Sequence, residues 1–197
     1  MLAGVSRYTA SVTAAATKSL PETIIAQLNS SSRADAFEAA KEVWNIDSSS
    51  VAKQLIETLK RGRRAFNRAA AAYAMQVVRD AHVTIALEST VRDKSENPKV
   101  RGEAAEALAH CHRKSTHNLL LKTLQDPSKE VRFWCAFALG QMRERKAVPI
   151  LRLLMSDHRQ VRGFHSVAKE AAEAIGEIER REPGWRCHWC VRDRRVL

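Results

Sequence analysis

Apolar and small residues recur along the chain at the spacing of an α-helix. Counting from Arg132, such residues follow at offsets of 3, 4, 6, 7 and 10, which lie on one broad face of a helix. The same offsets fit when the count starts at Arg101 or at Arg68, and small residues recur where small residues stood. The pattern predicts one helix that the chain repeats several times.

A second helix is predicted before each of these. It is marked by two aliphatic residues four positions apart: Leu55 and Leu59, Leu87 and Val91, Leu120 and Leu124, Ile150 and Leu154. Turn-forming residues separate each pair from the next arginine, among them Pro98 and Pro127, which cannot continue a helix interior. The repeating unit is therefore helix A, a short turn and helix B, with a period of about 32 residues.

The first and last units depart from this pattern. Ala36 stands where the first unit would carry its arginine, as expected of a terminal repeat that faces solvent. In the last unit Val161 and Arg162 are present, but the small-residue pattern restarts only at Val167. We expect a modified, longer or bent final helix B. The chain is predicted to form about five hairpins, which bury one another's apolar faces.

Residues 126–151 carry the pattern D-P-S-x-x-V-R-x-x-x-A-x-A-L-G, followed six residues later by A-V-P-x-L. This pattern resembles HEAT repeats of the phycobilisome-lyase-like type. The resemblance implies an all-α fold, a right-handed α-solenoid whose B helices line the concave side. It also implies a function, because members of the family mostly act as protein-binding scaffolds. A subset are subunits of bilin lyases or isomerases, and a related fold occurs in alkylpurine DNA glycosylases.

The solenoid is expected to span residues 21–181, between two segments of different composition. Residues 1–20 lack acidic residues and are rich in Ser, Thr and Ala, so we expect a flexible N-terminal segment, with an organelle transit peptide as the alternative. Residues 182–197 are expected to form a basic tail that contains Trp and Cys.

The four cysteines make no dense disulfide framework, which favours a reducing, cytoplasmic setting. No apolar run is long enough to span a membrane.

Arginines and aspartates recur in phase with the predicted core. They are Arg68, Arg101, Arg132 and Arg162 at the family's arginine position, with Asp126 and Asp157 at its turn-acid position. We expect a structural ladder in which the arginines bond to the turn acids and to free carbonyls at helix ends. The alternative is a row of arginines that reaches for phosphates.

The formal net charge of +11 indicates an acidic partner. The predicted binding residues are Arg61, Arg63, Arg64, Trp134, Arg143, Arg145, Lys146 and Arg159. The basic members lie at both edges of a solenoid and do not merge into one stripe, and the helix dipole explains several of them without a partner.

We therefore expect a non-catalytic scaffold or adaptor that binds an acidic protein surface through the concave face of its B helices. A nucleic-acid-binding solenoid is the first alternative, since a continuous basic track would favour it. A subunit of a bilin lyase-type complex is the second.

Signatures of catalysis are sparse. No histidine falls in a recognisable acid–base or nucleophile motif, and no Gly-rich phosphate loop is present, so we predict neither catalytic residues nor a cofactor. Cys187 and Cys190 supply two of the four ligands of a zinc site, and we do not expect bound metal. A glycosylase needs an aromatic pocket with a carboxylate, for which Phe133, Trp134 and Glu130 are the nearest residues.

Overall fold

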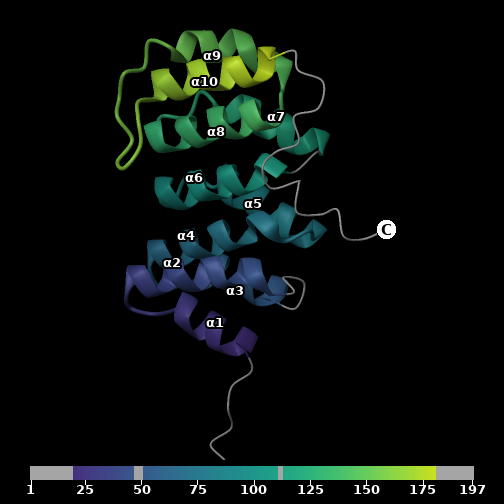
Figure 1. Cartoon of the computed structure of the whole chain (residues 1–197), viewed down its shortest axis with the longest axis vertical. Helices are drawn as coiled ribbons and strands as arrows, with labels where there is room; N and C mark the ends of the chain where they lie inside the picture. Colours follow the sequence, from purple (N-terminus) through teal and green to yellow (C-terminus); the bar gives the residue numbers. More distant parts are fainter. Residues whose placement is uncertain (1–19, 47–50, 111–112, 181–197) are drawn as a thin grey trace, which may run out of the picture.

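The computed structural model describes residues 20–46, 51–110 and 113–180. These residues form helices joined by short turns, and the helices pair into five hairpins. The hairpins are α1 (Leu20–Leu28) with α2 (Arg33–Glu42), α3 (Ala52–Arg61) with α4 (Ala65–Ala74), α5 (Ala81–Arg92) with α6 (Pro98–Ala107), α7 (Lys114–Thr123) with α8 (Lys129–Gln141), and α9 (Val148–Leu154) with α10 (Val167–Glu179). The predicted all-α solenoid is confirmed (Figure 1).

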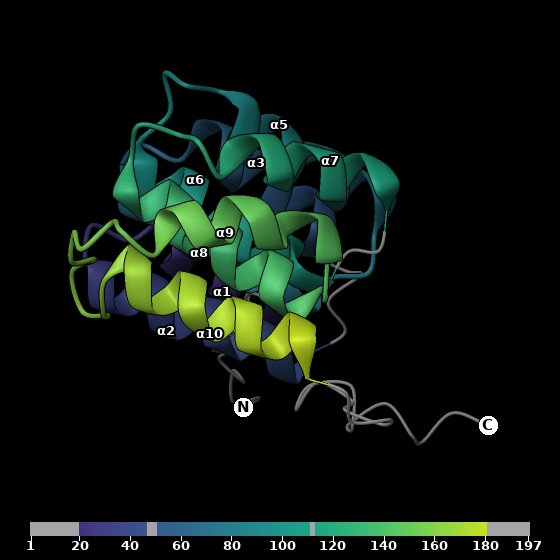
Figure 2. The ribbon, with the colours of Figure 1, turned by 90° about the horizontal axis from the view of Figure 1, so that it is seen from above.

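The helices lie in two layers. Each B helix packs on the next one, so that α2, α4, α6, α8 and α10 form one layer. The A helices α3, α5, α7 and α9 lie behind it. Seen from above, α2 and α10 stand forward of α6 and α8, which makes the outer face of the B layer concave (Figure 2).

Small side chains fill the space between neighbouring B helices. Ala72, Ala105 and Ala136, which share one position of the repeat, are fully buried. The helices α8 and α10 approach each other closely, because a Cβ on Gly140 would lie 2.9 Å from the Cα of Ala174. The alanines therefore let the helices pack closely, and they also favour the helix intrinsically.

The arginines of the B helices link each hairpin to the one that follows. Arg101 donates to the carbonyl of Val91 at the end of its own helix A, at 3.0 and 3.1 Å, and to the carboxylate of Asp126 in the next turn, at 2.6 and 3.2 Å. Arg132 repeats the arrangement with the carbonyl of Asp126 and the carboxylate of Asp157.

Arg68 follows the same plan with a different acid. It donates to the carbonyl of Gly62 at 2.8 Å and to both oxygens of Glu96, which takes the place of the turn aspartate. The first hairpin has Ala36 at the arginine position, and Asn67 provides the link instead by donating to the carbonyls of Leu28 and Ser30. Arg162, at the same sequence position of the last unit, is exposed.

The last hairpin is modified as expected, and its helix α10, with 13 residues, is longer than α4 and α6, with 10 each, but the added residues do not lie in the helix. The extra residues lie in a loop of residues 155–166 between α9 and α10. Val161 is buried against Phe133 and Val167, so the loop is held to α8. Gly163 allows the loop to turn back, because its φ of +86° suits glycine. The insertion thus brings Phe164 and His165 to the concave face.

Gly102 on α6 permits a close contact with α8. A Cβ at this position would lie 2.5 Å from Cδ1 of Trp134. We expect Gly102→Ala to lower the free energy of unfolding by about 1–3 kcal/mol, because the indole must move. Urea denaturation measures the change. Gly176→Ala on α10 is the matched control, because nothing lies within 4 Å of its added Cβ and alanine should stabilise that helix by up to about 1 kcal/mol. Equal effects of both substitutions would contradict the close contact.

No helix among the described residues is long and apolar enough to cross a membrane. The expected flexible N-terminal segment and the basic tail with Cys187 and Cys190 lie almost entirely outside the described residues. The domain boundaries at both ends therefore stay predictions.

Candidate functional site

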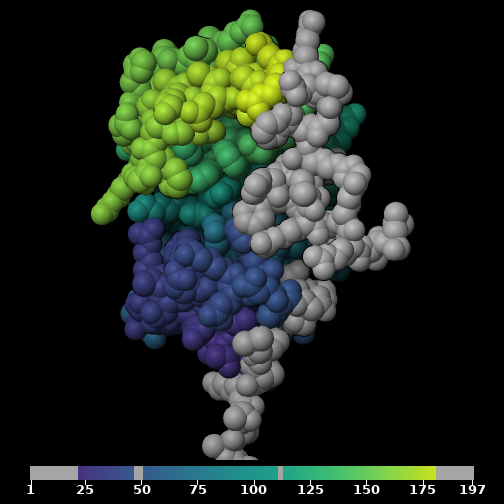
Figure 3. Space-filling view, in the orientation of Figure 1, coloured from purple at the N-terminus to yellow at the C-terminus, as the bar shows by residue number. Residues whose placement is uncertain are grey.

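A groove of about 380 Å³ lies on the concave face between α6, α8 and α10. We call it the acidic groove. Its walls carry four glutamates, one histidine and four aromatic residues: Glu106, Glu170, Glu173, Glu177, His165, Phe133, Trp134, Phe137 and Phe164. In the space-filling view the surface is set back between α10 with its preceding loop and α2, over α6 and α8 (Figure 3).

The repeat explains why these side chains face the groove. Counted from the valine that opens each B-helix pattern, Val100, Val131 and Val167, most of the lining residues on the B helices occupy the third, sixth or tenth following position. Many of the positions between them carry buried small residues, such as Ala104, Ala136 and Ala171. A helix places offsets of three, six and ten close to one face, so the stacked B helices present three rows to the groove.

Aromatic rings form the wall nearest the α9–α10 loop. Trp134 meets Phe133, Phe137 and Phe164 edge to face, with ring centroids 5.0, 5.7 and 4.9 Å apart. Such arrangements are favoured by the charge distribution of the rings. A second hollow of about 590 Å³ lies next to Trp134 and Phe164, and its lining includes Glu130 and Arg162.

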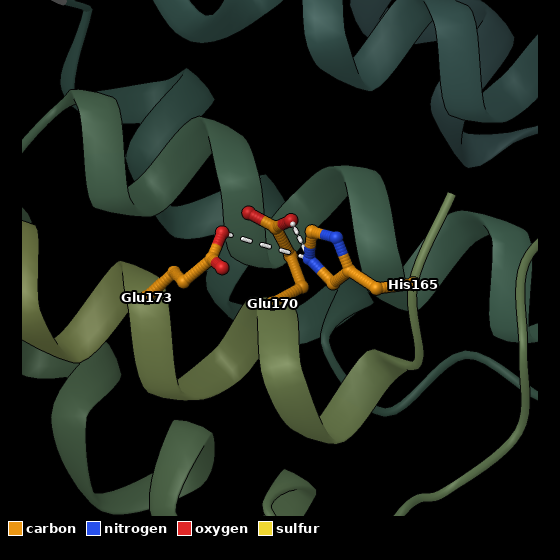
Figure 4. Close-up of side chains that lie close together, drawn as sticks. All are labelled: His165, Glu170 and Glu173. Carbon is orange, nitrogen blue, oxygen red and sulfur yellow. Dashed lines mark hydrogen bonds and ion pairs between the residues drawn. The ribbon is translucent and has the colours of Figure 1, made fainter. Parts of the chain in front are cut away.

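His165 faces two glutamates of α10 (Figure 4). Its Nε2 lies 2.9 Å from Oε2 of Glu170 and 3.6 Å from Oε2 of Glu173. Glu170 is only 5% exposed, whereas Glu173 is open to solvent. Burial, together with the charges of Glu173 and Glu106, raises the pKa of the Glu170 carboxyl to about 7.

Glu103 and Glu106 form a second carboxyl pair on α6. Burial raises the pKa of Glu103 to about 7, although its hydrogen bond with Glu106 and the charge of Arg33 act against the rise. Burial and the charge of Glu103 raise the pKa of Glu106 to about 8, while a hydrogen bond from Gln76 opposes this. Near neutral pH, the pair therefore retains a proton on the concave face.

We expect Glu106→Gln to stabilise the protein at pH 9. The folded-state pKa values of Glu103 and Glu106 lie above the usual 4.5. The contribution of this pair to the free energy of unfolding is therefore greatest below pH 4.5 and is lost as pH rises through 7 and 8. The glutamine removes one of these charges, so the gain in unfolding free energy should be about 1–3 kcal/mol at pH 9 and near zero at pH 4. Urea denaturation at both pH values, with the exposed Glu179→Gln as control, tests this. A gain independent of pH would contradict it.

The predicted basic binding residues lie outside the acidic groove, whereas Trp134 lines it. Arg61 pairs with Glu57 at 3.0 Å, Arg63 is exposed, and Arg64 lies over the ring of Phe66. Arg159 pairs with Asp157 at 2.7 Å. Burial alone would raise the pKa of Asp157, but hydrogen bonds from Arg159 and Arg132 lower it to about 2.

The other three predicted binding residues follow the C-terminal end of α8. Arg143 adopts a positive φ of 51° directly after the helix, and Arg145 and Lys146 are exposed in the next turn. Their role in binding stays a prediction.

Comparison with protein families identifies the repeat. Residues 86–164 match the family model for HEAT repeats. These residues therefore form HEAT repeats, which confirms the resemblance seen in the sequence.

Two curated relatives are enzymes. The chain is 43% identical over 75 residues to deoxyhypusine hydroxylase of Arabidopsis thaliana, which is 38% of this chain and 24% of that protein. It is 39% identical over 77 residues to deoxyhypusine hydroxylase-B of Oryza sativa subsp. japonica, which is 39% of this chain and 26% of the relative. The chain thus spans about a quarter of the length of these relatives.

Two solved structures resemble the fold at low similarity. The complex of CpcE and CpcF of phycocyanin lyase from Nostoc sp. PCC7120 has a TM-score of 0.44 at 21% identity, covering 89% of this chain and 58% of that chain. Human deoxyhypusine hydroxylase in complex with glycerol has a TM-score of 0.41 at 16% identity, covering 82% of this chain and 85% of that chain. Nothing about activity follows from either likeness.

The relatives correct the expected function. The expectation of a non-catalytic scaffold was wrong, because the curated relatives that the chain matches are enzymes. The expected binding of an acidic partner through the concave face was wrong as well. Glutamates line it, and they would repel an acidic protein or a nucleic-acid backbone. Sequence reasoning missed these glutamates because it considered the net charge rather than the rows that face the groove.

Proposed function

We propose that the chain is a hydroxylase, or a subunit of one, that binds an amine-bearing substrate of the deoxyhypusine kind in the acidic groove. The identity of 43% to a deoxyhypusine hydroxylase supports the reaction class. The lining of the groove supports the substrate class, and it is the observation that carries the proposal.

The groove suits a cationic amine for two reasons. Carboxylates of Glu173 and Glu177 offer charge-assisted hydrogen bonds to an ammonium group. The rings of Trp134 and Phe137 offer apolar contact to the substrate's carbon chain and a negative face to its charge. A net charge of +11 would disfavour such a ligand at long range, so recognition depends on this local concentration of acids.

The reaction balances with molecular oxygen and a two-electron reductant. One oxygen atom enters a C–H bond of the substrate, and the other leaves as water with two electrons and two protons. A redox group, when bound, supplies the activation of oxygen. The chain's own residues would hold the amine, orient the carbon chain along the aromatic wall and exclude water from part of the groove.

The test is a mass-spectrometric assay of the purified full chain. Deoxyhypusine, oxygen, ascorbate and ferrous iron are supplied, and a product heavier by one oxygen atom is expected. Glu177→Gln should raise KM more than it lowers kcat, because it removes a contact to the amine. The exposed Glu179→Gln is the matched control. No oxygen incorporation, together with no saturable binding of deoxyhypusine in calorimetry, would exclude the proposal.

A further inference from the structure

One wall of the acidic groove brings an imidazole nitrogen and two carboxylates to one point. Within the described part of the chain, His165, Glu170 and Glu173 are the group whose ligand atoms all lie within 4.8 Å of one another. His165 comes from the α9–α10 loop, and the two glutamates lie three positions apart on one face of α10. We propose that these three residues bind a single divalent cation that accepts mixed nitrogen and oxygen ligands, such as Mn²⁺ or Fe²⁺.

The spacing of the three groups suits one ion. Around a metal with bonds of about 2.1 Å, neighbouring ligand atoms lie about 3.0–3.4 Å apart. The imidazole Nε2 lies 2.9 Å from Glu170 and 3.6 Å from Glu173, so small movements of the two carboxylates would complete the arrangement. The ion takes the place of the proton that now joins the ring to Glu170, and that proton leaves to solvent.

The charges around Glu170 also favour a cation. Its carboxylate faces Glu173 on its own helix, Glu106 from α6 and His165 from the loop. Lys169 reaches only the other oxygen of Glu173, at 3.8 Å. One imidazole thus meets three carboxylates in a partly buried place. Buried carboxylates without compensating charge are costly, and a divalent ion offsets them.

The site keeps room for further ligands. Three protein ligands leave coordination positions open, as in catalytic rather than structural metal sites. These positions would face the groove of about 380 Å³. Phe133 packs against the His165 ring at a centroid distance of 5.3 Å, which restricts the ring's rotation. The inference deepens the proposed function, which needs a redox group, but it concerns binding alone.

The test uses Mn²⁺ and no turnover. The purified, chelator-treated full chain is titrated with Mn²⁺, and free ion is followed by electron paramagnetic resonance. Mn²⁺ is chosen because Cys187 and Cys190, as soft thiolate ligands, favour other metals. We expect one ion per chain. Glu173→Gln and His165→Gln should each weaken the affinity more than about tenfold, whereas Glu179→Gln and His158→Gln, on the same helix and loop, should change it less than about twofold.

Two results would overturn the site. One is the absence of saturable Mn²⁺ binding at millimolar concentration. The other is binding that Glu173→Gln and His165→Gln leave unchanged. Glu173 is exposed, so its substitution should not unfold the chain, and circular dichroism checks this. Mn²⁺ binding at these residues with neither hydroxylation nor binding of deoxyhypusine would exclude the proposed function alone, and hydroxylation without Mn²⁺ binding at these residues would exclude the metal site alone.

Discussion

Leu139→Asp should abolish cooperative unfolding of the protein. Leu139 lies on α8, which packs between α6 and α10, and is 0% exposed. The substitution removes a buried aliphatic side chain, at a cost of about 2–5 kcal/mol, and places a carboxylate without a partner in the core. The sum approaches the total stability of a typical domain, about 5–15 kcal/mol. Thermal melting followed by far-ultraviolet circular dichroism should show no sharp transition.

Leu153→Asp is the matched control for this experiment. Leu153 lies on α9 in the neighbouring hairpin and is 75% exposed. Its substitution should change the free energy of unfolding by less than about 0.5 kcal/mol. If Leu139→Asp melted as sharply as Leu153→Asp, the face of α8 that packs into the core would be misassigned.

Arg101→Ala should lower the free energy of unfolding by about 3–5 kcal/mol. The arginine and its partner Asp126 are both almost fully buried. Removal of the guanidinium leaves the Asp126 carboxylate without its counter-charge and the carbonyl of Val91 without its donors. Urea denaturation at pH 7 measures the loss.

Two comparisons isolate the buried pair. Arg152→Ala removes an exposed pair with Glu179 and should cost less than about 1 kcal/mol. Arg101→Met combined with Asp126→Leu should recover much of the lost stability, because no unpaired charge remains. A loss for Arg101→Ala no larger than that for Arg152→Ala would show that the ladder contributes little to stability.

The fold could be predicted because repetition multiplies a weak signal. One amphipathic stretch cannot be assigned with certainty, but the same offsets from Arg68, Arg101 and Arg132 place the buried alanines of three helices together. The arginines recur in phase with those alanines, which is why they reach helix ends and turn acids inside the stack.

The groove could not be predicted because it depends on which residues remain once the core is assigned. Glu103, Trp134 and Glu170 share one position of the repeat, and Glu106, Phe137 and Glu173 share another. They differ in chemistry, so they did not stand out as a motif. Their recurrence at positions without alanine was the available signal.

The insertion hid the remaining part of the site. Six added residues broke the register, so His165 had no counterpart in earlier units. Its approach to Glu170 depends on the path of the loop, which Val161 fixes by packing against Phe133. Such a contact between a loop and a distant helix follows from tertiary packing and not from periodicity.

The ladder also gives the array a polarity. Each arginine takes its carboxylate from the hairpin that follows, as Arg132 takes Asp157. Loss of the last hairpin would therefore leave the guanidinium of Arg132 without its carboxylate. Loss of the first hairpin would instead leave the neutral amide of Asn67 without the carbonyls to which it donates. The stack can be shortened from its beginning more readily than from its end, and any duplicated unit must bring the acid that its predecessor needs.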